Sequence, residues 1–156
     1  MHIKRFAGAI GQIAKTDKLI KLIKNCSEYK TKNNIIQSVP DVGKVVAASL
    51  LSNMPELGYI SNKEAASLVG VAPMNKESGT FKGKRKIRGG RHQIRTAMFM
   101  AMMSAMQCNP VSKSTYEKLV ASGKPKKVAI IACVRKMVVI LNTMVRDGVY
   151  WDPKMG

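Results

Sequence analysis

The chain has 156 residues, which is room for one ordinary domain, and its 46% hydrophobic content is enough to form a core. The 27 Lys and Arg residues against 9 Asp and Glu give a net charge of +18, and a protein with such an excess attracts polyanions. Only 5% of the residues are aromatic, which argues against a surface that stacks the bases of a single strand. The expected partner is therefore a nucleic acid held by its phosphates.

Composition also argues against several other classes of protein. The three cysteines are widely spaced and the only histidines are His2 and His92, so neither a disulfide framework nor a zinc site is expected. We therefore expect a cytoplasmic protein with reduced cysteines. Gln12 and Lys15 interrupt the apolar start, which argues against a signal peptide. The longest apolar stretch, 128–145, carries two basic residues near its centre, so no membrane partner is expected.

The first 34 residues give the weakest pattern. Apolar residues between Ile10 and Ile23 hint at a helix, whereas Lys30 to Asn34 indicates a polar loop.

From Ile35 to Leu51 two periodic apolar segments flank the turn Pro40-Asp41-Val42-Gly43, which resembles a helix-hairpin-helix. In that motif the N–H groups at the start of the second helix face a DNA phosphate, which would lie here at Gly43 and Lys44. Asp41 replaces the first glycine of the motif and argues against direct contact. It could instead cap the second helix. An αα-hairpin used only for packing is the equal alternative.

Ser61 and Glu64 form a capping box that predicts a short helix ending at Gly70. The stretch that follows, NKESGTFKGKRKIRGGRHQIR from Asn75 to Arg95, is too polar and too rich in glycine for a core. Its part from Lys82 to Arg95 holds seven cations, whereas no Asp or Glu occurs between Glu77 and Glu117. The cations predicted to bind phosphate are Lys82, Lys84, Arg85, Lys86, Arg88, Arg91 and Arg95.

Two details of this stretch bear on its shape. Ser78 lies in the turn that opens it, where its hydroxyl is expected to be exposed. A small β-hairpin turning at Gly83 is one prediction, and a solvated basic loop is the alternative.

Helical periodicity returns at Arg91 and continues to Asn109. Arg91 and Arg95 share a face at the start of this helix, an arrangement that makes sense if an anion lies there. A second capping box, Ser114 to Glu117, predicts a short helix that Gly123 ends. The longest predicted helix begins at Pro125, ends at Gly148 and is apolar almost all round, which makes it the core helix. The predicted fold is mainly α: a helix-hairpin-helix-like element and a helical bundle with a basic, Gly-rich loop.

The ordered motifs VPDVG, LVGVAP, ESGTFKGKRKIRGGRHQIR, NPVSKSTYEKL and GKPKKVAIIACVRKMVVILNTMVRDG resemble the C-terminal domain of the DEDD-type insertion-sequence transposases. These form the "IS one-ten" family, also called bridge-RNA-guided recombinases, and the resemblance covers about residues 19–152. It implies a mainly helical domain that works with an acidic, RNase-H-like domain holding Mg²⁺. It also implies that Ser78 is the nucleophile that attacks DNA. The implied partners are DNA, a guide RNA and intact transposase copies, in the nucleoid of a bacterial cytoplasm.

The beginning of the chain resembles the end of the acidic domain of that family. In FAGAIGQIAKTD, Asp17 matches one metal-binding acid, whereas Ile20 stands where a second is expected. The expected division is a remnant of the acidic domain (1–18), a remnant of a coiled-coil linker (19–34), the transposase domain (35–152) and a tail (153–156). One carboxylate cannot hold the magnesium that the four-acid site of the family would hold, so no cofactor is expected in this chain, and the chain is expected to be inactive alone.

The chemistry implied for Ser78 matches its neighbours in the sequence. A serine that attacks a phosphodiester must lose its proton, and cations must stabilise the charge that builds around phosphorus. Arg85, Arg88 and Arg91 are the expected phosphate clamps, with Lys84 and Arg95 behind them. No general base is evident, and His92 is a weak candidate. The alternatives are a non-enzymatic, sequence-independent nucleic-acid-binding module and an RNA-binding structural protein of the ribosomal kind.

Overall fold

A computed structural model describes residues 15, 18, 27–74, 77–78, 81–82, 86–87 and 90–155, with the four strands described by their backbone alone. Within these residues the mainly α prediction is confirmed, because six α-helices account for most of the chain. The elements are α2 (Ser27–Gln37), α3 (Lys44–Asn53), α4 (Asn62–Val69), β1 (Pro73–Met74), β2 (Glu77–Ser78), β3 (Phe81–Lys82), β4 (Lys86–Ile87), α5 (His92–Cys108), α6 (Pro110–Ala121), α7 (Lys126–Asp147) and the 3-10 turn η1 (Pro153–Met155).

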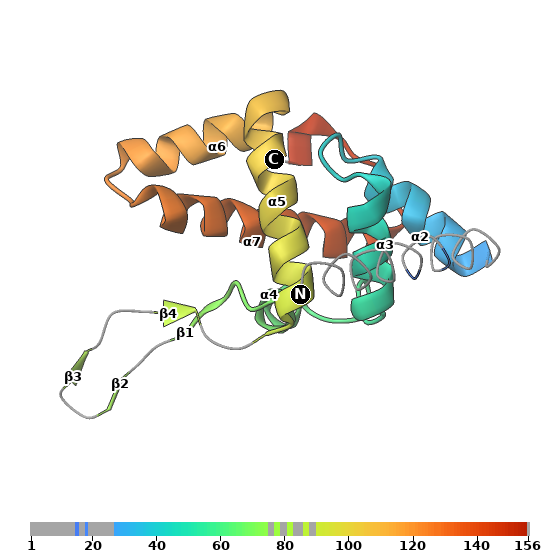
Figure 1. Cartoon of the computed structure of the whole chain (residues 1–156), viewed down its shortest axis with the longest axis horizontal. Coiled ribbons are helices and arrows are strands. Elements are labelled where there is room, and N and C mark those ends of the chain that lie inside the picture. The colour runs from blue at the N-terminus through green and yellow to red at the C-terminus, as the bar shows by residue number, and fades with distance from the viewer. Residues whose placement is uncertain are drawn as a thin grey trace, which may run out of the picture.

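Helix α7 is the core helix, as its apolar composition predicts. It packs against α2, α4, α5 and α6, and Figure 1 shows it passing behind α5. It is also the one described helix that is long and apolar enough to cross a membrane, but half of its most apolar window is buried inside the protein. Its predicted limits are confirmed, because Pro125 is its N-cap and Gly148 its C-cap.

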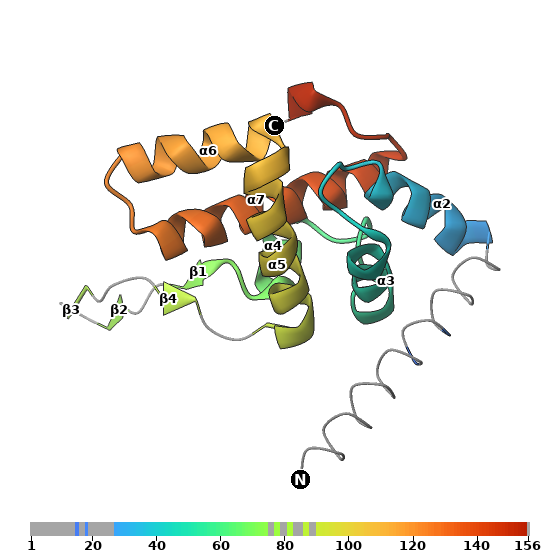
Figure 2. The ribbon, with the colours of Figure 1, turned by 45° about the horizontal axis from the view of Figure 1, so that its top comes forward.

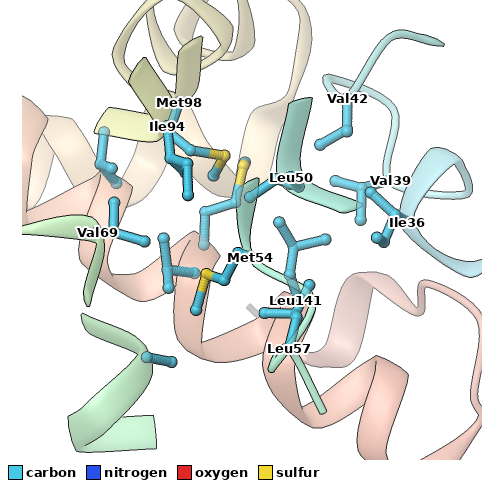
Figure 3. Packing of buried hydrophobic residues seen from close by; sticks show 14 of the residues in the cluster. Ile36, Val39, Val42, Leu50, Met54, Leu57, Val69, Ile94, Met98 and Leu141 are labelled. Carbon is cyan, nitrogen blue, oxygen red and sulfur yellow. The ribbon is translucent and has the colours of Figure 1, made fainter. Parts of the chain in front are cut away.

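The core lies where α2, α3, α4, α5 and α7 meet. Figure 3 shows side chains from each of these helices pointing toward one another, among them Ile36, Leu50, Val69, Met98 and Leu141. Each is at most 1% exposed. Burial of one such side chain contributes roughly 1.5–3 kcal/mol, so this cluster is the main source of the stability of the helical body.

Capping signals in the sequence predict one helix start correctly and one wrongly. The Ser61–Glu64 box is confirmed: Ser61 Oγ accepts from Glu64 N at 3.2 Å, and Glu64 Oε2 accepts from Ser61 N at 2.8 Å. The box predicted at Ser114 is wrong, because α6 begins four residues earlier, at Pro110. Asn109 caps it, since its Oδ1 accepts from Val111 N at 3.0 Å. Proline in the first turn, where no N–H is needed, decides this start.

The predicted pair of helices around Pro40 is present as α2 and α3, but two details differ. The polar loop predicted from Lys30 to Asn34 is wrong, because α2 already begins at Ser27. Its polar residues form the outer face of a helix whose Ile35 and Ile36 are buried. The cap predicted at Asp41 is also wrong. Gly43 is the N-cap of α3, and Asp41 Oδ2 instead accepts from Asn109 Nδ2 at 2.6 Å.

The four short strands form two antiparallel pairs in line with each other. Pro73 pairs with Ile87 in β1 and β4, and Ser78 pairs with Phe81 in β2 and β3. The chain therefore reverses between Ser78 and Phe81, so the hairpin turn predicted at Gly83 is wrong. Figures 1 and 2 show β2 and β3 far from the helices and β1 and β4 closer to them. The basic segment is thus a β-hairpin that projects from the helical body.

The predicted division of the chain is not tested by these elements. Helix α2 runs across the expected limit between residues 34 and 35, and most of residues 1–26 lie outside the described part.

Candidate nucleic-acid interface

The β-hairpin carries the predicted nucleophile and part of the predicted cationic cluster. Ser78 is the last residue of β2, Lys82 lies in β3 and Lys86 lies in β4. Because only two residues separate Ser78 from Phe81, Ser78 stands next to the reversal, at the end farthest from the helices. The predicted residues Asp17, Lys84, Arg85 and Arg88 lie outside the described residues.

The base of the hairpin is fixed to the helical body at Gly90. This residue has a φ of +86°, and a Cβ there would lie 2.3 Å from Gly70 Cα and 2.4 Å from Gly70 N. Only glycine allows the two backbones to approach so closely. The next residue, Arg91, donates its backbone N–H to Leu68 O at 2.8 Å. The chain leaving β4 is therefore held against the end of α4 before α5 begins.

The Arg91 guanidinium is held by groups of the protein itself, although its side chain is 37% exposed. Its Nη1 lies 2.9 Å from Glu56 Oε2, its Nη2 lies 2.7 Å from Glu56 Oε1, and Nη1 also donates to the backbone oxygen of Asn53. This hydrogen-bonded pair lowers the pKa of Glu56 from 4.5 to about 2 and raises the pKa of Arg91. The anion expected at the start of α5 is therefore the Glu56 carboxylate in this structure. Phosphate binding by Arg91 stays a prediction.

The remaining predicted residues lie in two different places. Arg95 is half-buried in the first turn of α5, one turn after Arg91. Gly43 and Lys44 are exposed at the start of α3, where nothing lies within 4 Å of a Cβ built on Gly43. In Figures 1 and 2, α3 and the strands lie on opposite sides of α5. The structure therefore does not bring Gly43 and Lys44 together with the hairpin.

The described residues do not fit a magnesium site. They contain no group of three or more His, Cys, Asp or Glu side chains that could hold a metal ion. Carboxylate oxygens, together with phosphate oxygens of a substrate, are the usual ligands of such a site. No catalytic step is therefore assigned to a metal bound by these residues.

Asn142 is a positioning residue that sequence reasoning missed. It is fully buried in α7. Its Oδ1 accepts from Gly58 N at 2.8 Å, and its Nδ2 donates to Ile60 O and Asn62 Oδ1 at 2.9 Å. These bonds hold the loop between α3 and α4, from which Glu56 reaches Arg91. The available signal is one amide directly after the apolar run 137–141, because a buried amide needs partners.

These features define a basic, helical domain that carries a cationic β-hairpin on a fixed base. The family model described as "Transposase IS116/IS110/IS902 family" matches residues 33–117, which is more than half of the chain. The chain therefore belongs to this transposase family. The matched range includes α3, α4, α5 and the whole hairpin.

Curated relatives agree with this assignment. The chain is 32% identical over 123 residues to the 43.6 kDa protein of insertion element IS110 from Streptomyces coelicolor, across 78% of this chain and 30% of that protein. It is 27% identical over 159 residues to the pilin gene-inverting protein of Moraxella bovis, across 99% of this chain and 48% of that protein. It is 28% identical over 123 residues to the 42 kDa protein of insertion element IS900 from Mycobacterium paratuberculosis, across 76% of this chain and 31% of that protein. The chain thus spans at most about half the length of these relatives.

Proposed function

We propose that this chain is the DNA-binding part of a recombinase of the bacterial cytoplasm, and that Ser78 is its nucleophile. The family assignment supports a role in moving DNA, and one relative is named for inverting a gene. The partners proposed beside DNA are a guide RNA and further copies of the transposase. The observation that carries the proposal is the place of Ser78 at the outer end of a projecting, cationic hairpin.

The position of Ser78 suits attack on a phosphodiester. The Ser78 oxygen would form a bond to phosphorus, the bond from phosphorus to one deoxyribose oxygen would break, and the proton of Ser78 would leave with a base while the released oxygen takes up a proton. Negative charge builds on the phosphate oxygens during this step, and nearby cations lower its energy. Lys82 and Lys86 follow Ser78 on the same hairpin, and Arg85 and Arg88 are the proposed clamps.

We propose that the active site is composite. The Glu56 carboxylate accepts two hydrogen bonds from the Arg91 guanidinium. Arg91 is therefore better suited to fix the base of the hairpin than to bind a substrate phosphate. We propose that an acidic part of the transposase holds the metal, since the chain covers at most about half the length of its relatives. The chain by itself would then bind DNA without cutting it.

A covalent-trapping assay tests the nucleophile. The protein is incubated with nicked duplex DNA, with and without the acidic part of a full-length relative and magnesium, and the products are separated on a denaturing gel. We expect an adduct only when both parts are present, and we expect Ser78→Ala to abolish it. Ser104→Ala, at an exposed serine in α5, is the matched control and should leave the adduct unchanged.

The outcomes separate two functions. An adduct that persists in Ser78→Ala would exclude Ser78 as the nucleophile. Duplex binding without any adduct under either condition would favour the non-enzymatic binding module instead.

A further inference from the structure

A second group of cations lies at the turn between α6 and α7. Lys124, Lys126 and Lys127 are all exposed there, and Lys118 adds a fourth positive charge from the last turn of α6. No Asp or Glu occurs between Glu117 and Asp147. Within the described part of the chain none of these four lysines forms an ion pair. With Glu117 included, the segment 117–127 carries four lysines and one acid, a net charge of +3.

The turn that carries these lysines has a defined backbone. Gly123 has a φ of +87°, and its N–H donates to Val120 O at 3.0 Å. Lys124 N donates to Leu119 O at 3.2 Å, and α6 packs along α7 on both sides of the turn. The lysine backbones are thus held close together. Like charges held in this way repel one another unless an anion lies against them.

The α6–α7 turn lies on the same side of the molecule as the hairpin. In Figures 1 and 2 both project beyond α5 in one direction, whereas α2 and α3 lie on the other side. Two basic projections therefore border one region of space. A long, stiff polyanion placed against the hairpin can extend along that side.

We infer that the lysines of the α6–α7 turn contact phosphates of the same duplex DNA that the hairpin binds. This inference rests on the function proposed above and adds a second contact surface to it. Lysines act as point charges on a phosphate backbone and carry no preference for base sequence. The segment 122–127 contains no Trp, Tyr or Arg, the residues that usually anchor protein–protein interfaces, so duplex DNA fits this surface better than an acidic protein.

Charge-matched variants test the inference. Lys126→Gln with Lys127→Gln removes two charges from the turn, and Lys30→Gln with Lys154→Gln removes two exposed charges from α2 and η1. Affinity for a fluorescent duplex is measured as a function of salt concentration. We expect the first variant to bind roughly tenfold or more weakly at 0.1 M salt, with a slope of log K against log salt smaller by about 1.8. The control should keep a slope close to that of the wild type, and both should unfold at the wild-type temperature.

Two other results would overturn the inference: equal slopes for the two variants, and a turn variant that binds DNA normally but no longer binds the separate acidic part of a relative. A hairpin variant, Lys82→Gln with Lys86→Gln, tells the two proposals apart. If it weakens binding and the turn variant does not, only this inference fails; if the wild type does not bind duplex DNA, the proposed function fails as well.

Discussion

The helical body and the two basic projections differ in the partners of their charged side chains. In the body, three acids have partners: Glu56 binds Arg91, Asp41 Oδ2 accepts from Asn109, and Asp147 binds Arg146, whereas the buried Asp41 Oδ1 has no hydrogen-bond partner. The cations of the α6–α7 turn form no ion pair in the described part of the chain. In the hairpin, Lys82 lies opposite Glu77 and Lys86 lies opposite Met74. Three acids of the body thus make contacts within the fold, whereas the α6–α7 turn and the hairpin are rich in cations. Substitutions in the two regions should therefore affect different quantities.

The largest loss of stability is expected at the base of the hairpin. In Gly90→Ala the new Cβ would meet the Gly70 backbone at 2.3 Å. Positive φ alone costs on the order of 1–3 kcal/mol for a residue with a side chain, and this collision adds to it. We expect the free energy of unfolding, measured by urea denaturation, to fall by more than the cost of positive φ alone.

Gly123→Ala is the control for the collision. Gly123 has nearly the same φ, +87°, but nothing lies within 4 Å of its Cβ position. It should lose only the strain of positive φ, roughly 1–3 kcal/mol. Equal losses for the two variants would show that Gly90 is not needed for the close approach to Gly70.

A smaller loss is expected when the Arg91–Glu56 pair is weakened. Glu56 is 37% exposed, so after allowance for solvent screening Glu56→Gln should lower the free energy of unfolding by about 0.5–1 kcal/mol at pH 7. The pKa of Glu56 is lowered from 4.5 to about 2 in the folded protein. Its contribution to stability is therefore complete above pH 4.5 and is lost as the pH falls toward 2.

Unfolding curves of the wild type and of Glu56→Gln between pH 7 and pH 2 check this. The difference between them should shrink below pH 4.5. A constant difference would mean that the Glu56 charge does not contribute.

Local signals in the sequence predicted much of the body. Gly70, Pro125 and Gly148 mark helix ends because each acts through its own backbone. The capping-box pattern from Ser114 to Glu117 gives a wrong helix start because the same pattern also occurs inside a helix. Helix α6 begins at Pro110.

The candidate site was less predictable, because its supports are distant in sequence. Glu56 and Arg91 are 35 residues apart, and Asn142 lies 84 residues from Gly58. The Gly70–Gly90 approach likewise depends on how α4 and α5 pack. Periodicity and capping patterns do not report such pairs. The chain reversal was placed at Gly83 instead of between Ser78 and Phe81, because glycine is frequent throughout this stretch and does not select one turn.

The smallest effect on stability, and a large effect on binding, is expected for Lys82→Gln with Lys86→Gln. The most direct test of the account measures both quantities on this one variant: its free energy of unfolding and the salt dependence of its affinity for duplex DNA. We predict an unfolding free energy within about 0.5 kcal/mol of the wild type, as for surface substitutions in general, and a salt slope smaller by about 1.8. Unchanged DNA affinity with a large loss of stability would contradict the account, because the hairpin would then belong to the body and not to the binding surface.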